Sequence, residues 1–123
     1  MIKALTTNQV PEFAGTQGEH YAVINNDGVV LAYFGLIMHW DFVGRVYYRH
    51  ASGHGIADTR MILKAVRRVL RERSHYYDRI EATVDISSDV DTKFALKLNF
   101  VIEGCMKKYI DGENHYLMRY SYV

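Results

Sequence analysis

A change of hydrophobic period at residues 52–55 constrains the fold of this chain more than any other feature. Before it, apolar residues come in short runs of the kind that form strands. After it, from residue 56 to about residue 73, apolar residues recur three and four positions apart, which places them on one face of an α-helix. The members of this series are Ile62, Ala65, Val66, Val69 and Leu70. The sequence therefore predicts strands followed by a long amphipathic helix.

The segment after this helix alternates between apolar and polar residues. Ile80, Ala82 and Val84 fall on one side of an extended chain, so residues 79–85 are predicted to form a strand with one buried face. A strand, a loop, a helix and a second strand make a βαβ unit. Its two strands are expected to be parallel and its crossover right-handed.

Three strands are predicted before the loop, over residues 20–25, 29–39 and 45–49. The first two flank Asn25-Asn26-Asp27-Gly28, a turn sequence that tolerates positive φ. Short connections between consecutive strands predict an antiparallel meander, with the long middle strand buried on both faces. Residues 1–19 carry only a weak pattern and are expected to be weakly structured or to form a first edge strand.

The pattern after residue 85 predicts a second helix and a closing hairpin. Ser87, Ser88 or Asp89 can cap the helix, which ends near Asn99. Residues 100–110 and 115–123 follow as two strands around a turn at 111–114, and the last strand places alternate residues on one face: Tyr116, Met118, Tyr120 and Tyr122. The order is βββ-α-β-α-ββ. It predicts one α/β (α+β) domain over residues 1–123, with a mixed, mostly antiparallel twisted sheet of six or seven strands and two main helices.

Charge and composition exclude several classes of protein. A net charge of +1 does not indicate a polybasic protein, so nucleic acid is not expected as a partner. No apolar run reaches the length of a signal peptide or a membrane span, and the single cysteine, Cys105, cannot form an internal disulfide. We expect a cytoplasmic protein without a membrane partner. His50 and His54 are four residues apart, as metal ligands often are, but no third ligand accompanies them, and no metal is expected.

The loop His50-Ala51-Ser52-Gly53-His54-Gly55 lies between a predicted strand and a predicted helix. Glycines there let backbone N–H groups approach an anion, and the helix dipole adds positive potential, so the loop suits a phosphate or pyrophosphate. Two glycines also fit a loop that only turns the chain. The loop lacks the Lys-Ser/Thr ending of a P-loop and the third glycine of a dinucleotide fingerprint, which argues against those two nucleotide-binding classes.

In its order of elements the chain resembles the GNAT superfamily of acyl-CoA-dependent N-acetyltransferases. Residues 50–55 are similar to the family's Gln/Arg-x-x-Gly-x-Gly/Ala pyrophosphate loop. Residues 98–104, Leu-Asn-Phe-Val-Ile-Glu-Gly, resemble its Leu-Gly-Phe-x-x-Glu-Gly stretch, and the closing arm around Lys107-Lys108-Tyr109 resembles the terminal hairpin of protein N-terminal acetyltransferases. The resemblance covers residues 20–123 and rests on spacing and order.

The chain departs from this family pattern in several places. His50 stands where the family has Gln or Arg, and Asn99 replaces a glycine. Ala95 occupies the place of a tyrosine that protonates the departing CoA thiolate in many members. Nineteen residues precede His20, where the family normally inserts two helices that shape the acceptor site, so we expect an N-terminally abbreviated member. By analogy, so short a chain suits a bacteriophage protein acting in the host cytoplasm.

The resemblance implies direct transfer of an acetyl group from acetyl-CoA to a primary amine, and an open acceptor side favours an amine of a protein or peptide. Acetyl-CoA is expected between the third strand and the strand over residues 79–85, where a backbone N–H near Tyr47 or Tyr48 can stabilise the oxyanion. The expected cofactor-binding residues are Tyr47, Arg49, His50, Ser52, Gly53, His54, Gly55, Ile56 and Ala57.

Catalysis needs a proton acceptor for the amine and a proton donor for the thiolate. The candidate acceptors are Asp85 and either His39 or His115; the candidate donors are Tyr109 and Tyr48. Asp85 also fits a simple capping residue. The alternative function is a non-catalytic GNAT-like module that binds CoA or another protein, such as a viral structural or host-interacting protein, which the missing tyrosine favours. A homodimer through the final hairpin is left open.

Overall fold

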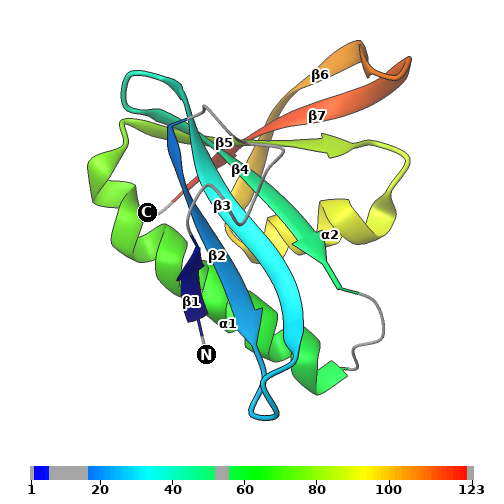
Figure 1. Ribbon diagram of the computed structural model, residues 1–123. Coiled ribbons are helices and arrows are strands. Elements are labelled where there is room, and N and C mark those ends of the chain that lie inside the picture. Colours follow the sequence, from blue (N-terminus) through cyan, green and yellow to red (C-terminus); the bar gives the residue numbers. More distant parts are fainter. Residues whose placement is uncertain (1, 6–16, 52–55, 122–123) are drawn as a thin grey trace.

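The computed structural model describes residues 2–5, 17–51 and 56–121, with no side-chain description for residues 56 and 57. Its elements are β1 (Ile2–Leu5), β2 (Gly18–Ile24), β3 (Val30–Trp40), β4 (Val43–His50), α1 (Ile56–Arg73), a 3-10 turn η3 (Ser74–Tyr76), β5 (Arg79–Asp85), α2 (Asp89–Lys97), β6 (Phe100–Ile110) and β7 (Glu113–Tyr120). The strands form one seven-stranded sheet in the order β1-β2-β3-β4-β5-β7-β6 (Figure 1). This confirms the predicted fold class.

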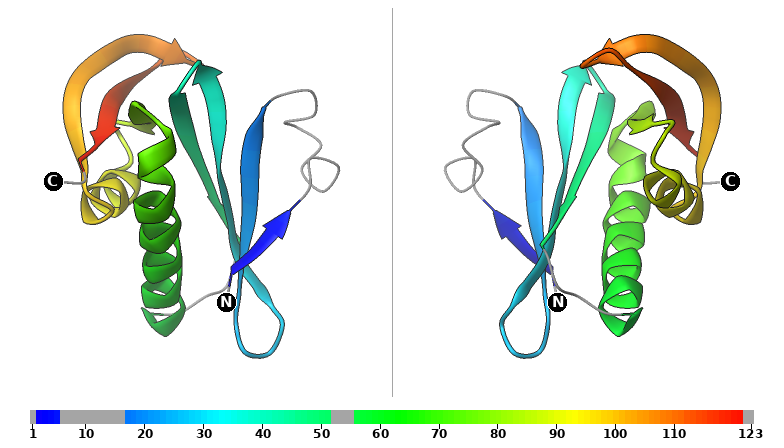
Figure 2. Two further views of the ribbon diagram at one scale, coloured as in Figure 1. Left: turned by 90° about the vertical axis from the view of Figure 1, so that its left-hand side faces the viewer. Right: turned by 90° about the vertical axis from the view of Figure 1, so that its right-hand side faces the viewer.

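Strand direction also follows the prediction. β1 to β4 are successively antiparallel, and β5, β7 and β6 form a second antiparallel group. The two groups meet at β4 and β5, which are parallel and are connected through α1. Figure 2 shows α1 and α2 on the same face of the sheet, with the β6–β7 hairpin curving over their side. The predicted βαβ unit therefore joins the two halves of the molecule.

The hydrophobic core lies between this face and the helices. Its largest fully buried side chains come from both groups of strands and from α1: Val23, Leu36, Ile62, Val66, Leu70, Ile80 and Met118. Burial of each such side chain stabilises the fold by about 1.5–3 kcal/mol. The predicted burial of the middle strand on both faces is confirmed in part: on the face opposite Phe34, Leu31 and Gly35 are buried, whereas Tyr33 is exposed.

The terminal hairpin is tighter than predicted. Its turn consists of Asp111 and Gly112 alone, with φ values of 51° and 75°, the combination that a two-residue type I′ turn requires. Glu113 and Asn114 therefore belong to β7, and the predicted four-residue turn is wrong. Tyr116, Met118 and Tyr120 share the core face as predicted, whereas Tyr122 lies outside the described residues.

Both ends of α2 show why this sequence forms a short helix there. Of the three predicted capping residues, Ser88 is the N-cap, and its hydroxyl accepts a hydrogen bond from the backbone N–H of Asp91. At the other end Asn99 has a φ of 70°. This left-handed conformation is usual for the residue that follows a helix, and asparagine tolerates it better than most residues. Asn99 thus fills the conformational role of the glycine that it replaces in the family pattern.

Candidate functional site

The parallel strands β4 and β5 pair over only part of their length. Val43, Gly44 and Arg45 pair with residues 79–81, and beyond this point the two strands diverge (Figure 1). β4 continues to His50 and β5 to Asp85, but the facing edges of these two segments are not paired with each other. We call this opening the fork. Along this opening the described residues of β4 and β5 share no ladder with each other.

The closed end of the fork is held on both faces of the sheet. On the helix-covered face the ring of Tyr77 packs on Gly44; a Cβ there would lie 2.9 Å from Tyr77 Cε1. On the opposite face Glu81 accepts hydrogen bonds from Arg45 Nη2 at 3.0 Å and from Arg79 Nε at 2.7 Å. Burial disfavours the Glu81 carboxylate, but the hydrogen bonds from the two arginines outweigh this effect and lower its pKa. The closed end therefore combines aromatic packing with an ion-pair cluster.

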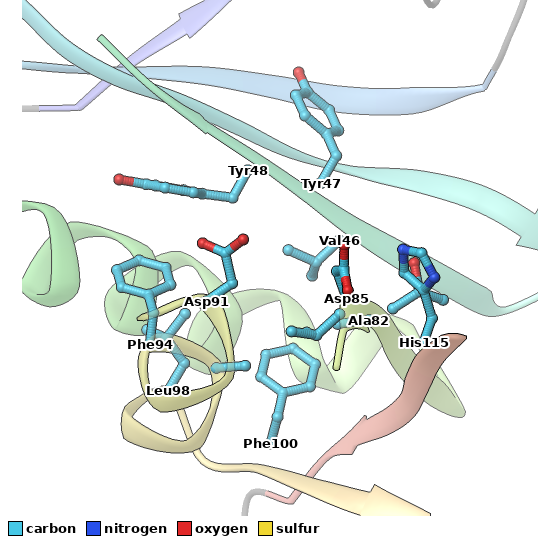
Figure 3. A pocket seen from close by; sticks show the side chains of 13 residues that line it. Val46, Tyr47, Tyr48, Ala82, Asp85, Asp91, Phe94, Leu98, Phe100 and His115 are labelled. Carbon is cyan, nitrogen blue, oxygen red and sulfur yellow. The ribbon is translucent and has the colours of Figure 1, made fainter. Parts of the chain in front are cut away.

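The open end of the fork contains a cavity of about 360 Å³ between the strands and α2 (Figure 3). Its apolar lining comes from β4, β5, α2 and β6: Val46, Ala82, Val84, Phe94, Ala95, Leu98 and Phe100. Residues with polar side chains also line it, namely Tyr47, Tyr48, Thr83, Asp85, Asp91 and His115. An apolar cavity with a few polar groups at its edge is the usual form of a small-molecule site.

Tyr48 is the predicted catalytic residue that most clearly faces this cavity. Its ring lies over Phe94, with ring centroids 4.5 Å apart, on the opposite side of the cavity from His115 in Figure 3. Burial and, to a lesser extent, the charge of Asp91 raise the pKa of Tyr48 to about 12. The phenol is therefore protonated at neutral pH and can donate its proton.

Asp85 also lines the cavity, at the end of β5. Its Oδ1 accepts hydrogen bonds from the hydroxyl of Ser87 at 2.7 Å and from the backbone N–H of Ser87 at 2.9 Å. These bonds, with a smaller contribution from His115, lower the pKa of Asp85. The carboxylate is thus ionised and oriented by its turn, which makes it a weak proton acceptor and a fixed negative charge.

Tyr109, the third predicted catalytic residue, lies elsewhere. It does not line the cavity, and its hydroxyl accepts a hydrogen bond of 2.8 Å from Arg45 Nη1 on the face of the sheet opposite the helices. The β6–β7 register shifts between Met106 and Ile110, and Lys108 has a φ of 51°. This bulge turns the Tyr109 side chain back toward the closed end of the fork. The structure therefore places Tyr48 and Tyr109 in different surroundings.

The predicted cofactor-binding residues are only partly described. Tyr47 borders the cavity, but its side chain points away from it, and its hydroxyl lies 2.7 Å from His20 Nδ1 (Figure 3). Arg49 and His50 are exposed at the end of β4. Ser52, Gly53, His54 and Gly55 lie outside the described residues, and of Ile56 and Ala57 only the backbone, which opens α1, is described.

Sequence reasoning missed Asp91 as a residue of the cavity. Asp91 lies one helical turn before Phe94 and Ala95, and the i, i+3, i+4 spacing puts all three on the face of α2 that borders the cavity. That spacing was the available signal. Within the described ranges, no three His, Cys, Asp or Glu side chains come close enough to hold a metal ion. No helix in the same ranges is long and apolar enough to cross a membrane.

Neither a family model nor a curated protein matches the sequence. Solved structures do match. An IAA acetyltransferase from Bacillus cereus superposes with a TM-score of 0.76 at 13% identity, over 98% of this chain and 97% of that chain. The spermidine/spermine N-acetyltransferase SpeG from Vibrio cholerae superposes with a TM-score of 0.69 at 14% identity, over 97% of this chain and 90% of that chain. A ribosomal-protein-S5-alanine acetyltransferase from Vibrio fischeri superposes with a TM-score of 0.65 at 21% identity, over 91% of this chain and 66% of that chain. These similarities show that the chain has the fold of these acetyltransferases, which agrees with the GNAT-like fold expected from the sequence.

Proposed function

We propose that this protein transfers an acetyl group from acetyl-CoA directly to a primary amine. The observation that carries the proposal is the fork, where the diverging strands β4 and β5 border an apolar cavity of about 360 Å³. The pantetheine arm of CoA is a chain of methylene and amide groups, so it fits an apolar cavity that is bordered by strand backbone. Structural neighbours whose names give acetyl transfer to several kinds of acceptor support the same chemistry.

The chemistry assigns a role to each part of the fork. The amine nitrogen attacks the thioester carbonyl carbon, the C–S bond breaks, and the thiolate takes up a proton. Tyr48 is the proposed proton donor, because its phenol is neutral and borders the cavity. Tyr109 and Asp85 stay predictions for catalysis, and residues 50–57 for the pyrophosphate.

We assign the acceptor to the amines of proteins or peptides. The connection between β1 and β2 spans residues 6–17, which is shorter than two average helices of about 10–14 residues each. A short connection supports an open acceptor side that admits a large substrate. The ribosomal-protein-S5-alanine acetyltransferase provides a structural precedent for a protein acceptor on this fold.

A second function, CoA binding without catalysis, is favoured by one residue. Ala95 borders the cavity at the position where the family pattern has its proton-donating tyrosine. If Tyr48 does not replace that tyrosine, the fork binds its ligand but does not promote turnover.

Thermal denaturation with acetyl-CoA, CoA and ATP as the nucleotide control tests binding. Ligands that bind the native state raise its melting temperature, so both CoA species should raise it and ATP should not. Release of free thiol from acetyl-CoA in the presence of a peptide mixture then separates the enzyme from the binding module. An unchanged melting temperature at millimolar acetyl-CoA contradicts both functions.

A matched pair of variants in α2 locates the binding site. Ala95→Phe fills the cavity and should abolish the acetyl-CoA shift, because Ala95 lines it. Leu96→Phe introduces the same ring at the neighbouring residue, which is exposed and does not line the cavity, and should preserve the shift. Equal shifts in the two variants would place the ligand outside the fork.

A further inference from the structure

His115 of β7 is a buried polar side chain that borders the cavity of the fork. Only 8% of its surface is exposed, and Figure 3 shows it across the cavity from Tyr48. Its Nδ1 lies 3.2 Å from the backbone carbonyl oxygen of Glu113. A carbonyl oxygen only accepts hydrogen bonds, so this contact favours the imidazole tautomer with the proton on Nδ1. The lone pair is then on Nε2.

We propose that Nε2 of His115 takes the proton from the acceptor amine. This inference rests on the proposed acetyl transfer and adds a catalytic residue to it. Histidine is the side-chain type that most readily exchanges a proton near neutral pH, where an alkylamine is mostly protonated and cannot attack a thioester.

The groups around His115 suit this role. Asp85 is its register partner on β5, so an ionised carboxylate lies beside the imidazole. The ring of Tyr109 on β6 meets the imidazole edge-on, with centroids 5.8 Å apart. Tyr48 on β4 and Asp91 on α2 line the same cavity. Asp85 is therefore a positioning and electrostatic residue, rather than the base itself.

The proton balance is complete without another reactant. Nε2 takes one proton from the ammonium group, and the free amine forms the C–N bond. When the C–S bond breaks, its electron pair leaves with the thiolate. The second proton of the nitrogen reaches the thiolate, directly or through the phenol of Tyr48. His115 then returns its proton to solvent, so each turnover yields an amide, CoA thiol and one proton.

The other histidine that the sequence left open lacks these features. His39 is exposed near the end of β3, where its ring packs against Trp40 with centroids 4.8 Å apart. It lines neither of the two cavities described for the molecule. His39 is therefore the matched control.

The test compares His115→Asn with His39→Asn. The asparagine amide can still donate to the Glu113 carbonyl but has no group at the position of Nε2. We expect kcat/KM for an alkylamine-bearing peptide to fall at least about a hundredfold at pH 7 in His115→Asn, and to remain unchanged in His39→Asn. The deficit should shrink as the pH is raised, because the amine then loses its proton to solvent. The acetyl-CoA shift in melting temperature should match the wild type.

A purely structural role of His115 predicts a different profile, in which the loss of activity is equal at all pH values; that result overturns the inference. Full activity of His115→Asn overturns it as well, while leaving the proposed function intact. Long-range ¹H–¹⁵N spectra of the imidazole provide a readout independent of turnover: a proton on Nε2 in the neutral ring contradicts the assignment. Absence of turnover by the wild type with every amine overturns the proposed function and this inference together.

Discussion

The two halves of the β4–β5 pair differ in how they are held. In the closed half, strand pairing is reinforced by Tyr77 on Gly44 and by the ion pairs of Glu81. In the open half, the same two strands share no ladder, and α2 and β7 provide the walls of a cavity instead. The segment with strand pairing and the segment that lines the cavity are thus successive parts of the same two strands. Removing a packing or ion-pair side chain of the closed half should therefore lower the free energy of unfolding more than removing a polar group from the wall of the open half.

The largest effect on stability is expected from Ile80→Ala in the closed half. Ile80 pairs with Gly44 and is 1% exposed in the core. Its truncation leaves a cavity and should lower the free energy of unfolding by about 2–5 kcal/mol, measured by urea denaturation. Val90→Ala on the exposed surface of α2 is the control and should change it by less than about 0.5 kcal/mol. A similar effect of the two substitutions would show that the closed half is not a stabilising segment.

A smaller effect is expected from Glu81→Gln, which removes the charge between Arg45 and Arg79. The loss should be about 1–3 kcal/mol at pH 7, because two arginines keep their charge without the carboxylate. Glu72→Gln breaks the exposed Arg68–Glu72 pair and should cost less than about 0.5 kcal/mol.

The pH dependence of the same variant follows from the lowered pKa of Glu81. Hydrogen bonds from the arginines, opposed by burial, keep this pKa below its ordinary value of 4.5. The ionised carboxylate therefore stabilises the fold above that value, and its contribution disappears as the pH falls further. Denaturation of wild type and variant should accordingly converge under acid conditions. A difference in free energy of unfolding between wild type and variant that grows as the pH falls would contradict the stabilising role of the ionised Glu81.

The smallest effect at neutral pH is expected from Tyr48→Phe in the open half, less than about 0.5 kcal/mol. Burial raises the pKa of Tyr48 from 10.0 to about 12, so the folded state favours the neutral phenol. That contribution is complete below pH 10 and is lost as the pH rises toward 12. Between pH 9 and pH 11 the melting temperature of the wild type should therefore fall more than that of Tyr48→Phe. Parallel curves would show that the phenol is not buried in the fork.

Local patterns were sufficient to predict much of the fold. The spacing of apolar residues placed α1 at its observed limits, Ile56–Arg73, and the apolar run after Asn99 placed β6 at Phe100–Ile110. The parallel pairing of β4 and β5 also followed from the order of elements. These features depend on neighbours in sequence or on general rules of chain connection.

The geometry of the candidate site was less predictable, because it depends on contacts between distant segments. The pairing of β4 and β5 stops after Arg45 and Glu81, and no local pattern marks that point. The position of Tyr109 depends on the bulge at Lys108. The bulge brings Tyr109 into contact with Arg45, which lies 64 positions earlier in the sequence. The contact of 3.2 Å between His115 Nδ1 and the Glu113 carbonyl oxygen likewise depends on the two-residue turn, which places Glu113 in β7.

Arg45 connects three strands through one side chain. Its guanidinium donates to Glu81 on β5 and to Tyr109 on β6, while its backbone belongs to β4. The curved β6–β7 hairpin is thereby tied at its far end to the point where the fork closes. The hydrogen bond between Arg45 and Tyr109 therefore restrains the tip of the hairpin relative to the closed end of the fork. A movement of its tip by more than the length of a hydrogen bond breaks the Arg45–Tyr109 contact, so the motion of the hairpin and the integrity of the closed end are coupled.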